Sequence, residues 1–496
     1  MSVPVHERVV RLGRNGEDYP MIRSLITLGA VLLTSTALAQ DITPVADFVT
    51  TDKANDFRGL AYGADGKIYV SGHLGDPSAE TNPSTVVVVG RLNADGTPDT
   101  TFSEDGFAEV DLGPGVEQSL AVAPLANGDV VAAVNVNEAD GGISVFLVRF
   151  DSTGKPVTGT WGGDTGAVEV VFGWPNASND SFPGVENPPQ DTAWDLQVDN
   201  SSGTEKLVVA GHGSAAEGSG RTDADRYVTR LIAADGTLDP DFNGGKPFTY
   251  HSAQALNEGG RRVTIGANGS IMSAGYTNLG DTLRNHVILI HLNPDGTLDQ
   301  DFGGFVSPQS SGEAIGLTAT PGVAVFNPFV VDQGFTEAYA AVQLSDGSWV
   351  TTGYGGATGE AIPSTLGFKT TEAPDIVSFK VSGKELDTSY GTNGNVVAQS
   401  EGLGLPTAED RGRHVLLLPG DRTMHVGRFG GQPAVVVVDA SGKLDTSVSG
   451  DGILELPNDA LNAQFFGVDL SPDGKSVALS TNNDKAGARV VVLSLN

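Results

Sequence analysis

Short runs in which apolar and polar residues alternate, each closed by an Asp-Gly or Asn-Gly turn, recur along the whole chain. GLAYGADGKIYVSGH (59–73) places two such runs around a DG turn, and AAVQLSDGSWVTTGY (340–354) repeats the arrangement. Alternation with a period of two is typical of β-strands with one buried face, and Asp-Gly supplies the positive φ angles of a tight hairpin turn. We therefore predict a series of β-hairpins.

A second hairpin follows each of these first ones. A strand such as TVVVVGRL (85–92) or HVILIHL (286–292) leads into a DGTLD-type turn and a short strand such as GFAEVDL (106–112). Four antiparallel strands per unit, repeated without a helical pattern, predict the blades of a β-propeller. The fold class is therefore all-β.

The number of hairpins predicts the number of blades. We count seven first hairpins but six complete second ones, and the last unit ends one strand short at ARVVVLSLN (488–496). The segment ITPVADFVTT (42–51) resembles an outer strand and has no blade of its own. We predict a seven-bladed propeller that is closed by this N-terminal strand, which would cover both open sheet edges. Eight blades are the alternative, because 312–334 has room for another pair of strands.

The repeated units also carry a family resemblance. DGKIYVSG (65–72), followed by GRLNADGTPDTTFSEDGFAEVDLG (90–113), resembles the delta-60 repeat, a bacterial propeller repeat of largely uncharacterised function. The resemblance extends over nearly all of 42–496 and is strong at 92–106 and 292–304. It implies a propeller and implies no reaction.

The DGTLD turn has two interpretations. In LNPDGTLDQDFGG (292–304), Asn293, Asp295 and Gly296 fit positions 3, 5 and 6 of a calcium loop. Position 1 would then be His291, and a cation there repels a metal. The alternative needs only Gly at positive φ and Asp as a local cap, with Phe302 folding over the blade. We favour this structural interpretation and predict no metal site and no cofactor, with calcium as the one cofactor left open.

The N-terminus differs from the repeats. MIRSLITLGAVLLTSTALAQ (21–40) has a basic start, a short apolar run and Ala37-Leu38-Ala39, which are the zones of a secretory signal peptide. We predict an N-terminal extension and signal peptide over 1–39, with the signal proper at 21–39, and a single propeller domain over 40–496. Residues 1–20 do not fit the signal pattern, and their translation stays open. The chain is expected in the periplasm or outside the cell after cleavage near Ala39, with no stable membrane span.

The composition excludes some classes of binding partner and of catalytic chemistry. The formal net charge is −32, and an acidic surface repels phosphate backbones, so we expect no nucleic acid partner. There is no Cys, which excludes disulfide bonds and thiolate chemistry. No G-x-S-x-G or H-E-x-x-H motif occurs, so no catalytic residue is assigned. The favoured function is a monomeric scaffold that binds a small molecule, a carbohydrate or a protein. The alternative is a hydrolase or lactonase with a metal or His/carboxylate site.

The connections predict where a site would lie. Those after the second and fourth strands vary widely in length, as at 173–190 and 353–375, so the long loops share one face of the propeller. Two positions of the repeat line the axis at this face and mix aromatic, imidazole and guanidinium groups. The alternative is that these side chains merely plug the channel. At the start of the first strands, the predicted ligand-binding residues are Arg58, Trp194, Arg261, Tyr339 and His414, with Leu120 and Phe466 at the same position. After the second strands they are His73, His212, Tyr276, Tyr354 and Arg428.

Overall fold

The computed structural model describes residues 42–495 with internal gaps, and this part of the chain contains thirty β-strands and no helix. The signal-peptide prediction at 21–39 and the long connection 173–190 lie outside the described residues. Among the described residues, no helix is long and apolar enough to cross a membrane. The residues not described are 1–41, 77–83, 114, 139–140, 173–190, 216–222, 253–256, 280–283, 307–316, 330–333, 358, 360, 363, 365–368, 371, 393–394, 399–408, 457–462, 483–486 and 496.

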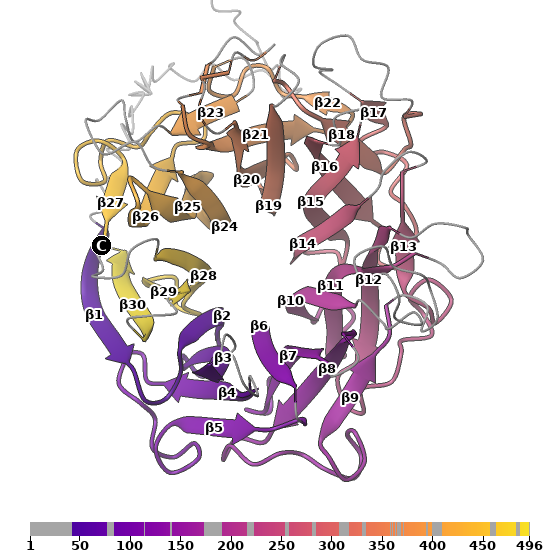
Figure 1. Ribbon diagram of the computed structural model, residues 1–496. Coiled ribbons are helices and arrows are strands. Elements are labelled where there is room, and N and C mark those ends of the chain that lie inside the picture. The colour runs from indigo at the N-terminus through magenta and orange to yellow at the C-terminus, as the bar shows by residue number, and fades with distance from the viewer. Residues whose placement is uncertain are drawn as a thin grey trace, which may run out of the picture. The chain divides into compact units, whose positions relative to one another are not determined.

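The strands form seven sheets around one axis, which confirms the seven-bladed prediction (Figure 1). The first strand of each blade lies at the centre. Blades 1 to 3 contain β2 (Asp56–Tyr62), β3 (Ile68–Asp76), β4 (Ser84–Leu92) and β5 (Phe107–Val110); β6 (Val116–Pro124), β7 (Val130–Asn137), β8 (Ile143–Phe150) and β9 (Ala167–Val170); and β10 (Thr192–Asp199), β11 (Lys206–Ser214), β12 (Ala224–Ile232) and β13 (Phe248–Tyr250).

The remaining blades follow the same order with two additions. Blade 4 has a fifth strand, and in blade 5 two short strands share the outer edge of the sheet. Blades 4 and 5 contain β14 (Glu258–Ile265), β15 (Ile271–Leu279), β16 (Arg284–Leu292), β18 (Val323–Phe326) and β17 (Phe305–Val306); and β19 (Phe335–Gln343), β20 (Trp349–Gly356), β21 (Asp375–Ser382), β22 (Glu385–Leu386) and β23 (Asn395–Ala398). Blades 6 and 7 contain β24 (Arg411–Leu418), β25 (Arg422–Phe429), β26 (Gln432–Val438) and β27 (Ile453–Glu455); and β28 (Gln464–Leu470), β29 (Ser476–Asn482), β30 (Ala488–Leu495) and β1 (Ile42–Thr50).

The N-terminal strand closes the ring, as predicted. β1 pairs antiparallel with β30 from Ile42↔Leu495 to Thr50↔Ala488. The Arg489 guanidinium donates to both carboxylate oxygens of Asp47, at 2.8 and 2.7 Å. Blade 7 therefore takes its fourth strand from the other end of the sequence (Figure 1).

The alternative of eight blades is wrong, because the doubtful segment completes blade 4. β18 is the fourth strand of that sheet and pairs antiparallel with β16, and β17 lies parallel to β18. All four residues of β18, VAVF, are buried, whereas both residues of β17 are only half-buried. The insertion thus supplies a more apolar outer strand to an existing blade.

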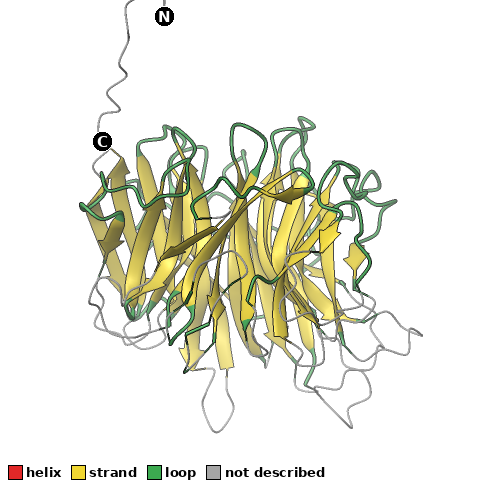
Figure 2. Cartoon of the chain, turned by 90° about the horizontal axis from the view of Figure 1, so that it is seen from above, coloured by secondary structure: helices red, strands yellow, loops and turns green. Residues whose placement is uncertain are grey.

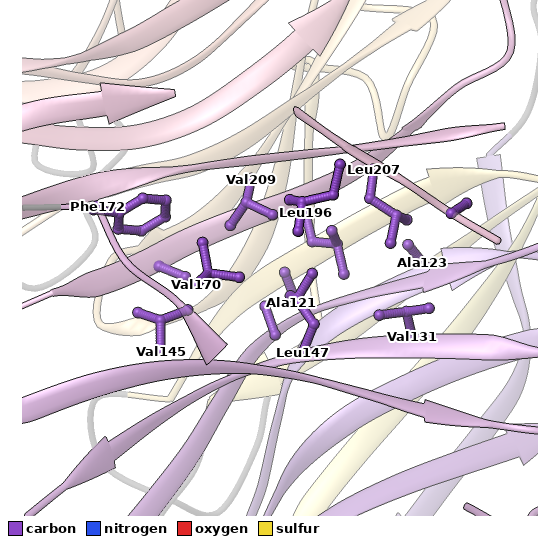
Figure 3. Packing of buried hydrophobic residues seen from close by; sticks show 14 of the residues in the cluster. Ala121, Ala123, Val131, Val145, Leu147, Val170, Phe172, Leu196, Leu207 and Val209 are labelled. Carbon is purple, nitrogen blue, oxygen red and sulfur yellow. The ribbon is translucent and has the colours of Figure 1, made fainter. Parts of the chain in front are cut away.

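The hydrophobic core is divided among the interfaces between blades. The described residues form seven buried clusters, each joining two neighbouring blades. Figure 3 shows the one between blades 2 and 3, in which Ala121 and Leu147 of blade 2 pack against Leu196 and Val209 of blade 3. Because every blade buries both of its faces in this way, its stability depends on both neighbours.

The DGTLD turn proves to be a link between blades. Asp295 Oδ1 accepts hydrogen bonds from the backbone N and the hydroxyl of Thr297, at 3.0 and 2.6 Å. The Asn243 N–H of blade 3 donates to the Asp295 carbonyl of blade 4 at 2.7 Å. Equivalent bonds join Ser103 to Thr153, Gly303 to Gly383 and Gly391 to Ser441.

The remaining side chains of this turn are also structural. His291 Nδ1 lies 2.8 Å from Asp299 Oδ2, and its ring packs against Phe302 at 5.4 Å. Burial lowers the pKa of His291, so the imidazole is neutral rather than the cation that the sequence suggested. In the first repeat, Arg91 pairs in the same way with Asp99 at 2.8 Å.

Candidate functional site

The first strand of each blade contains an irregularity near its start. The register of pairing with the second strand skips one residue in six blades and two residues in blade 4. Such β-bulges re-aim side chains. The skipped residues are Arg58, Leu120, Trp194, Arg261 with Arg262, Tyr339, Arg413 and Phe466.

Glycine on the second strand accommodates this bulge. A Cβ atom at Gly72 would lie 1.8 Å from the Asp56 carbonyl oxygen, and one at Gly353 would lie 1.8 Å from that of Glu337. Similar distances hold at Gly211, Gly275 and Gly427. The Gly that ends the second strand in the repeat is therefore required by the close approach of the first strand.

The connections define two faces of the propeller. Those between first and second strands and between third and fourth strands leave one face, here named the turn face. Those between second and third strands and from each blade to the next leave the opposite face, the loop face (Figure 2). The bulges lie near the start of the first strands and therefore near the loop face.

Guanidinium and aromatic groups from different blades meet at this end of the axis. The Arg261 guanidinium lies 4.2 Å from the Trp194 ring centroid, 4.8 Å from that of Tyr339 and 4.9 Å from that of Tyr276. Arg413 lies 4.4 Å from the Tyr339 ring. Contacts of this kind are favourable, and more so where water is excluded.

One contact crosses the axis. Arg262 of β14 donates from Nη2 to the carbonyl of Phe466 in β28 at 2.7 Å, and its guanidinium lies 5.6 Å from that ring. Trp194 of blade 3 also stacks with Phe466 at 6.5 Å. Blades 3, 4 and 7 are thus joined directly at the centre of the ring.

Positive charge exceeds negative charge in this cluster. Arg58 pairs with Asp56 at 2.7 Å, Arg261 with Glu337 at 3.3 Å and Arg262 with Asp195 at 3.3 Å. Both Arg411 and Arg428 bind the one carboxylate of Glu409. Arg413 donates to the neutral amide of Gln464 at 2.8 Å and has no carboxylate partner among the described residues. In the part of the chain that the structure describes, these six guanidinium groups thus have four carboxylate partners in all.

Three of these polar side chains contain buried nitrogen atoms without an acceptor in the described structure. They are Trp194 Nε1, Arg261 Nε and Arg411 Nε. A buried donor without an acceptor costs free energy, so such atoms are few in proteins and call for an explanation.

The predicted histidines do not come together in a single site. His73 is buried, with Nδ1 2.8 Å from Asp56 Oδ1. Burial alone would raise the pKa of Asp56, but the bond to His73 and the charge of Arg58 lower it below the ordinary value. Burial, with the charges of Arg261 and Arg226, lowers the pKa of His212 to about 3. Among the described residues, no group of three or more His, Asp or Glu is placed to hold a metal ion.

The prediction of His414 at this position of blade 6 is wrong by one residue. The bulge contains Arg413, whereas His414 is paired in register with Val426. In blade 1 five residues separate the last pair, Tyr62↔Ile68, but in blade 6 three residues separate Leu418↔Arg422. The prediction takes the residue at a fixed distance before the first turn, so the shorter turn of blade 6 shifts it from Arg413 to His414. Burial, together with Arg262, lowers the pKa of His414 well below its usual value.

Of the predicted residues, Trp194, Arg261, Tyr276 and Tyr339 lie together at the axis, and Tyr354 joins them through a contact with Tyr339 at 5.9 Å. Arg58 contacts the Phe466 ring at 5.8 Å, and Arg428 lies beside Glu409. Sequence reasoning missed Arg262, Arg411 and Arg413. The paired arginines in GGRR (259–262) and the arginines separated by one glycine in RGRH (411–414) are the available signal.

Comparison with known proteins agrees with the fold and adds no function. A family described as a domain of unknown function (DUF5122) beta-propeller matches residues 63–102. No curated protein sequence matches the chain.

Solved structures resemble the chain at low identity. A protein of unknown function from Dyadobacter fermentans is 12% identical with a TM-score of 0.45, covering 92% of this chain and 99% of its own. The polysaccharide lyase Uly1 is 11% identical with a TM-score of 0.46, covering 92% and 100%. The soluble aldose sugar dehydrogenase of Escherichia coli is 14% identical with a TM-score of 0.35, covering 76% and 96%. Such values say nothing of function.

Proposed function

We propose that this propeller is an exported binding scaffold that takes up an anionic ligand at the axis of its loop face. The observation that carries the proposal is the Arg413 guanidinium, which is buried beside Gln464 and aromatic rings without a carboxylate partner among the described residues. Burial lowers the pKa of Arg413, and neighbouring Arg411 and Arg261 lower it further. A bound anion would offset this unfavourable charge.

The groups around Arg413 suit a cyclic ligand that carries a carboxylate group. Guanidinium groups bind carboxylates with paired hydrogen bonds, and the half-buried Trp194 and Tyr276 offer aromatic faces. A carboxylate ligand would also supply an acceptor for the three buried nitrogen atoms that have none in the described structure, which are Trp194 Nε1, Arg261 Nε and Arg411 Nε. An acidic sugar combines both features, so we take D-glucuronate as the probe.

The alternative function, a hydrolase with a His/carboxylate site, is less well supported by the carboxylates and histidines at this end of the axis. Glu337 is paired with Arg261 and Asp56 with His73 and Arg58, while burial keeps His212 and His414 neutral. These groups stabilise one another rather than forming a free acid–base pair.

Replacing Arg413 by Met should weaken glucuronate binding about tenfold or more, because a charge-assisted hydrogen bond contributes roughly 1.5–3 kcal/mol. The melting temperature should change little, since removing a buried charge that has no carboxylate partner among the described residues offsets the lost contacts with Tyr339 and Gln464. Calorimetric titration of the mature protein measures both the wild type and the variant, with glucose as the uncharged control ligand.

Lys443→Met is the matched control, because it removes one positive charge from an exposed site on the turn face. Its glucuronate affinity should equal that of the wild type. Equal binding of glucose and glucuronate, or undiminished binding by Arg413→Met, would show that the cluster only fills the channel.

We also propose that the repeats belong to the delta-60 family and that the chain is exported with cleavage after Ala39. Ala37 and Ala39 offer the small side chains that signal peptidase requires. N-terminal sequencing of the exported protein should begin at Gln40. Recovery outside the cytoplasm of a chain that retains 25–33 contradicts the proposal.

A further inference from the structure

A cavity of about 250 Å³ lies at the turn face, at the end of the axis opposite the arginine cluster. It is lined where the first strands of blades 1, 2, 3 and 7 end, by residues of β2, β6, β10 and β28 and the turns that follow them. The volume is just below the range of about 300–1,000 Å³ found for small-molecule sites. It suits a ligand of a few heavy atoms.

Two carboxylates line this cavity without a cationic partner among the described residues. Asp469 accepts hydrogen bonds from the backbone N–H groups of Tyr62 and Leu470, at 2.7 and 2.8 Å. Glu205 accepts one from the backbone N–H of Ala126 at 2.7 Å. Burial raises the pKa of Asp469 to about 6, so this carboxyl is mostly ionised at pH 7.5. The cavity is therefore negative, opposite in sign to the arginine cluster.

A third polar group in the lining has no hydrogen-bond partner among the described residues. The Tyr62 side chain is buried, and its hydroxyl oxygen has no hydrogen-bond partner in the described structure. Burial raises the pKa of Tyr62, and the charges of Asp469 and Asp473 raise it further, so the hydroxyl stays protonated. Buried hydroxyl groups without a partner are uncommon, and a ligand donor would satisfy this one.

Apolar side chains form much of the remaining wall, beside the polar Gln197 and Asn200. Val122, Leu125, Leu196 and Val198 line it. Leu125 and Leu196 also belong to the buried cluster between blades 2 and 3, part of which Figure 3 shows. A ligand that combines a cationic donor with a short apolar body would match the carboxylates and the apolar part of this lining.

We propose that this cavity binds a small primary alkylammonium ion, held by the Asp469 and Glu205 carboxylates and the Tyr62 hydroxyl oxygen. An ammonium group donates three hydrogen bonds and matches these acceptors in number. Its alkyl chain would lie against Val122 and Leu196. A quaternary ammonium ion fits less well, because it has no N–H to donate and, among the described residues of the lining, Tyr62 is the one aromatic side chain.

Calorimetric titration of the mature protein with n-butylammonium chloride tests the proposal, with sodium chloride at equal ionic strength and tetramethylammonium chloride for comparison. We expect saturable binding of butylammonium, with tetramethylammonium at least about tenfold weaker. Asp469→Asn should weaken butylammonium binding about tenfold or more, as expected for loss of a charge-assisted bond. Absence of saturable binding overturns the proposal.

Tyr62→Phe keeps the experiment decisive if Asp469→Asn fails to fold. It removes a hydroxyl that makes no hydrogen bond to any described residue, so stability should be retained, while butylammonium binding should weaken several-fold. Tyr69→Phe is the matched control, because Tyr69 lies on the next strand of the same blade and does not line the cavity. Equal losses in both variants, or none in Tyr62→Phe, contradict the assignment. Arg413→Met should bind butylammonium normally, so the two proposed sites succeed or fail separately.

Discussion

A chain that lacks residues 1–50 should be less stable than the full propeller by several kcal/mol, out of a total of about 5–15 kcal/mol for a domain. The deletion removes β1, the fourth strand of blade 7, and uncovers the edge of β30. It also removes Ala46 and Phe48, which pack against the buried cluster between blades 7 and 1. Urea unfolding followed by tryptophan fluorescence measures the loss.

The control is a chain that lacks only residues 1–41, which keeps every described residue of β1. Its unfolding midpoint should equal that of the full chain. The larger deletion should also self-associate, because the exposed edge of β30 offers unpaired backbone groups, and sedimentation velocity detects this. An unchanged midpoint after removal of 1–50 would show that β1 does not stabilise the ring.

Gly353→Ala should have the largest effect of any single substitution considered, about 3–5 kcal/mol of lost stability. The new Cβ atom would lie 1.8 Å from the Glu337 carbonyl oxygen and 3.1 Å from the Ala338 Cα. Because that contact is with backbone, the bulge that directs Tyr339 to the axis must shift. Glucuronate binding should therefore fall together with the free energy of unfolding.

Gly347→Ala separates this clash from the general cost of replacing glycine. Gly347 lies in the turn of the same hairpin at φ +83°, and a Cβ there meets no atom within 4 Å. The left-handed conformation alone should cost about 1–2 kcal/mol. Chemical denaturation of both variants gives the comparison, and equal losses would rule out the bulge as the reason for the repeated glycine.

The pattern along the chain was sufficient to predict the architecture. Period-two alternation and Asp-Gly turns specify hairpins locally, so the number of blades follows from the sequence without any knowledge of tertiary contacts. The missing strand after 488–496 and the unattached strand at 42–51 predicted the ring closure that β1 and β30 make. Only the structure excluded the eighth blade, because the sequence of 312–334 does not reveal which sheet β18 joins.

The sequence also predicted that side chains at one position of the repeat meet at the axis, since equivalent positions of a closed ring lie at similar heights. Trp194, Arg261 and Tyr339 meet in this way. In blade 6 the bulge contains Arg413 rather than the predicted His414, because the turn after the first strand is shorter there.

Charge balance and contacts across the ring were decided by tertiary structure alone. The bond from Arg262 to the Phe466 carbonyl joins residues 204 positions apart. The excess of guanidinium groups over carboxylates at the loop face depends on which partner each arginine finds in the folded chain. The cavity at the turn face joins Tyr62, Glu205 and Asp469 from three blades. Local sequence determines each hairpin, whereas a site at the axis depends on side chains from several blades, whose distances and burial follow only from closure of the ring.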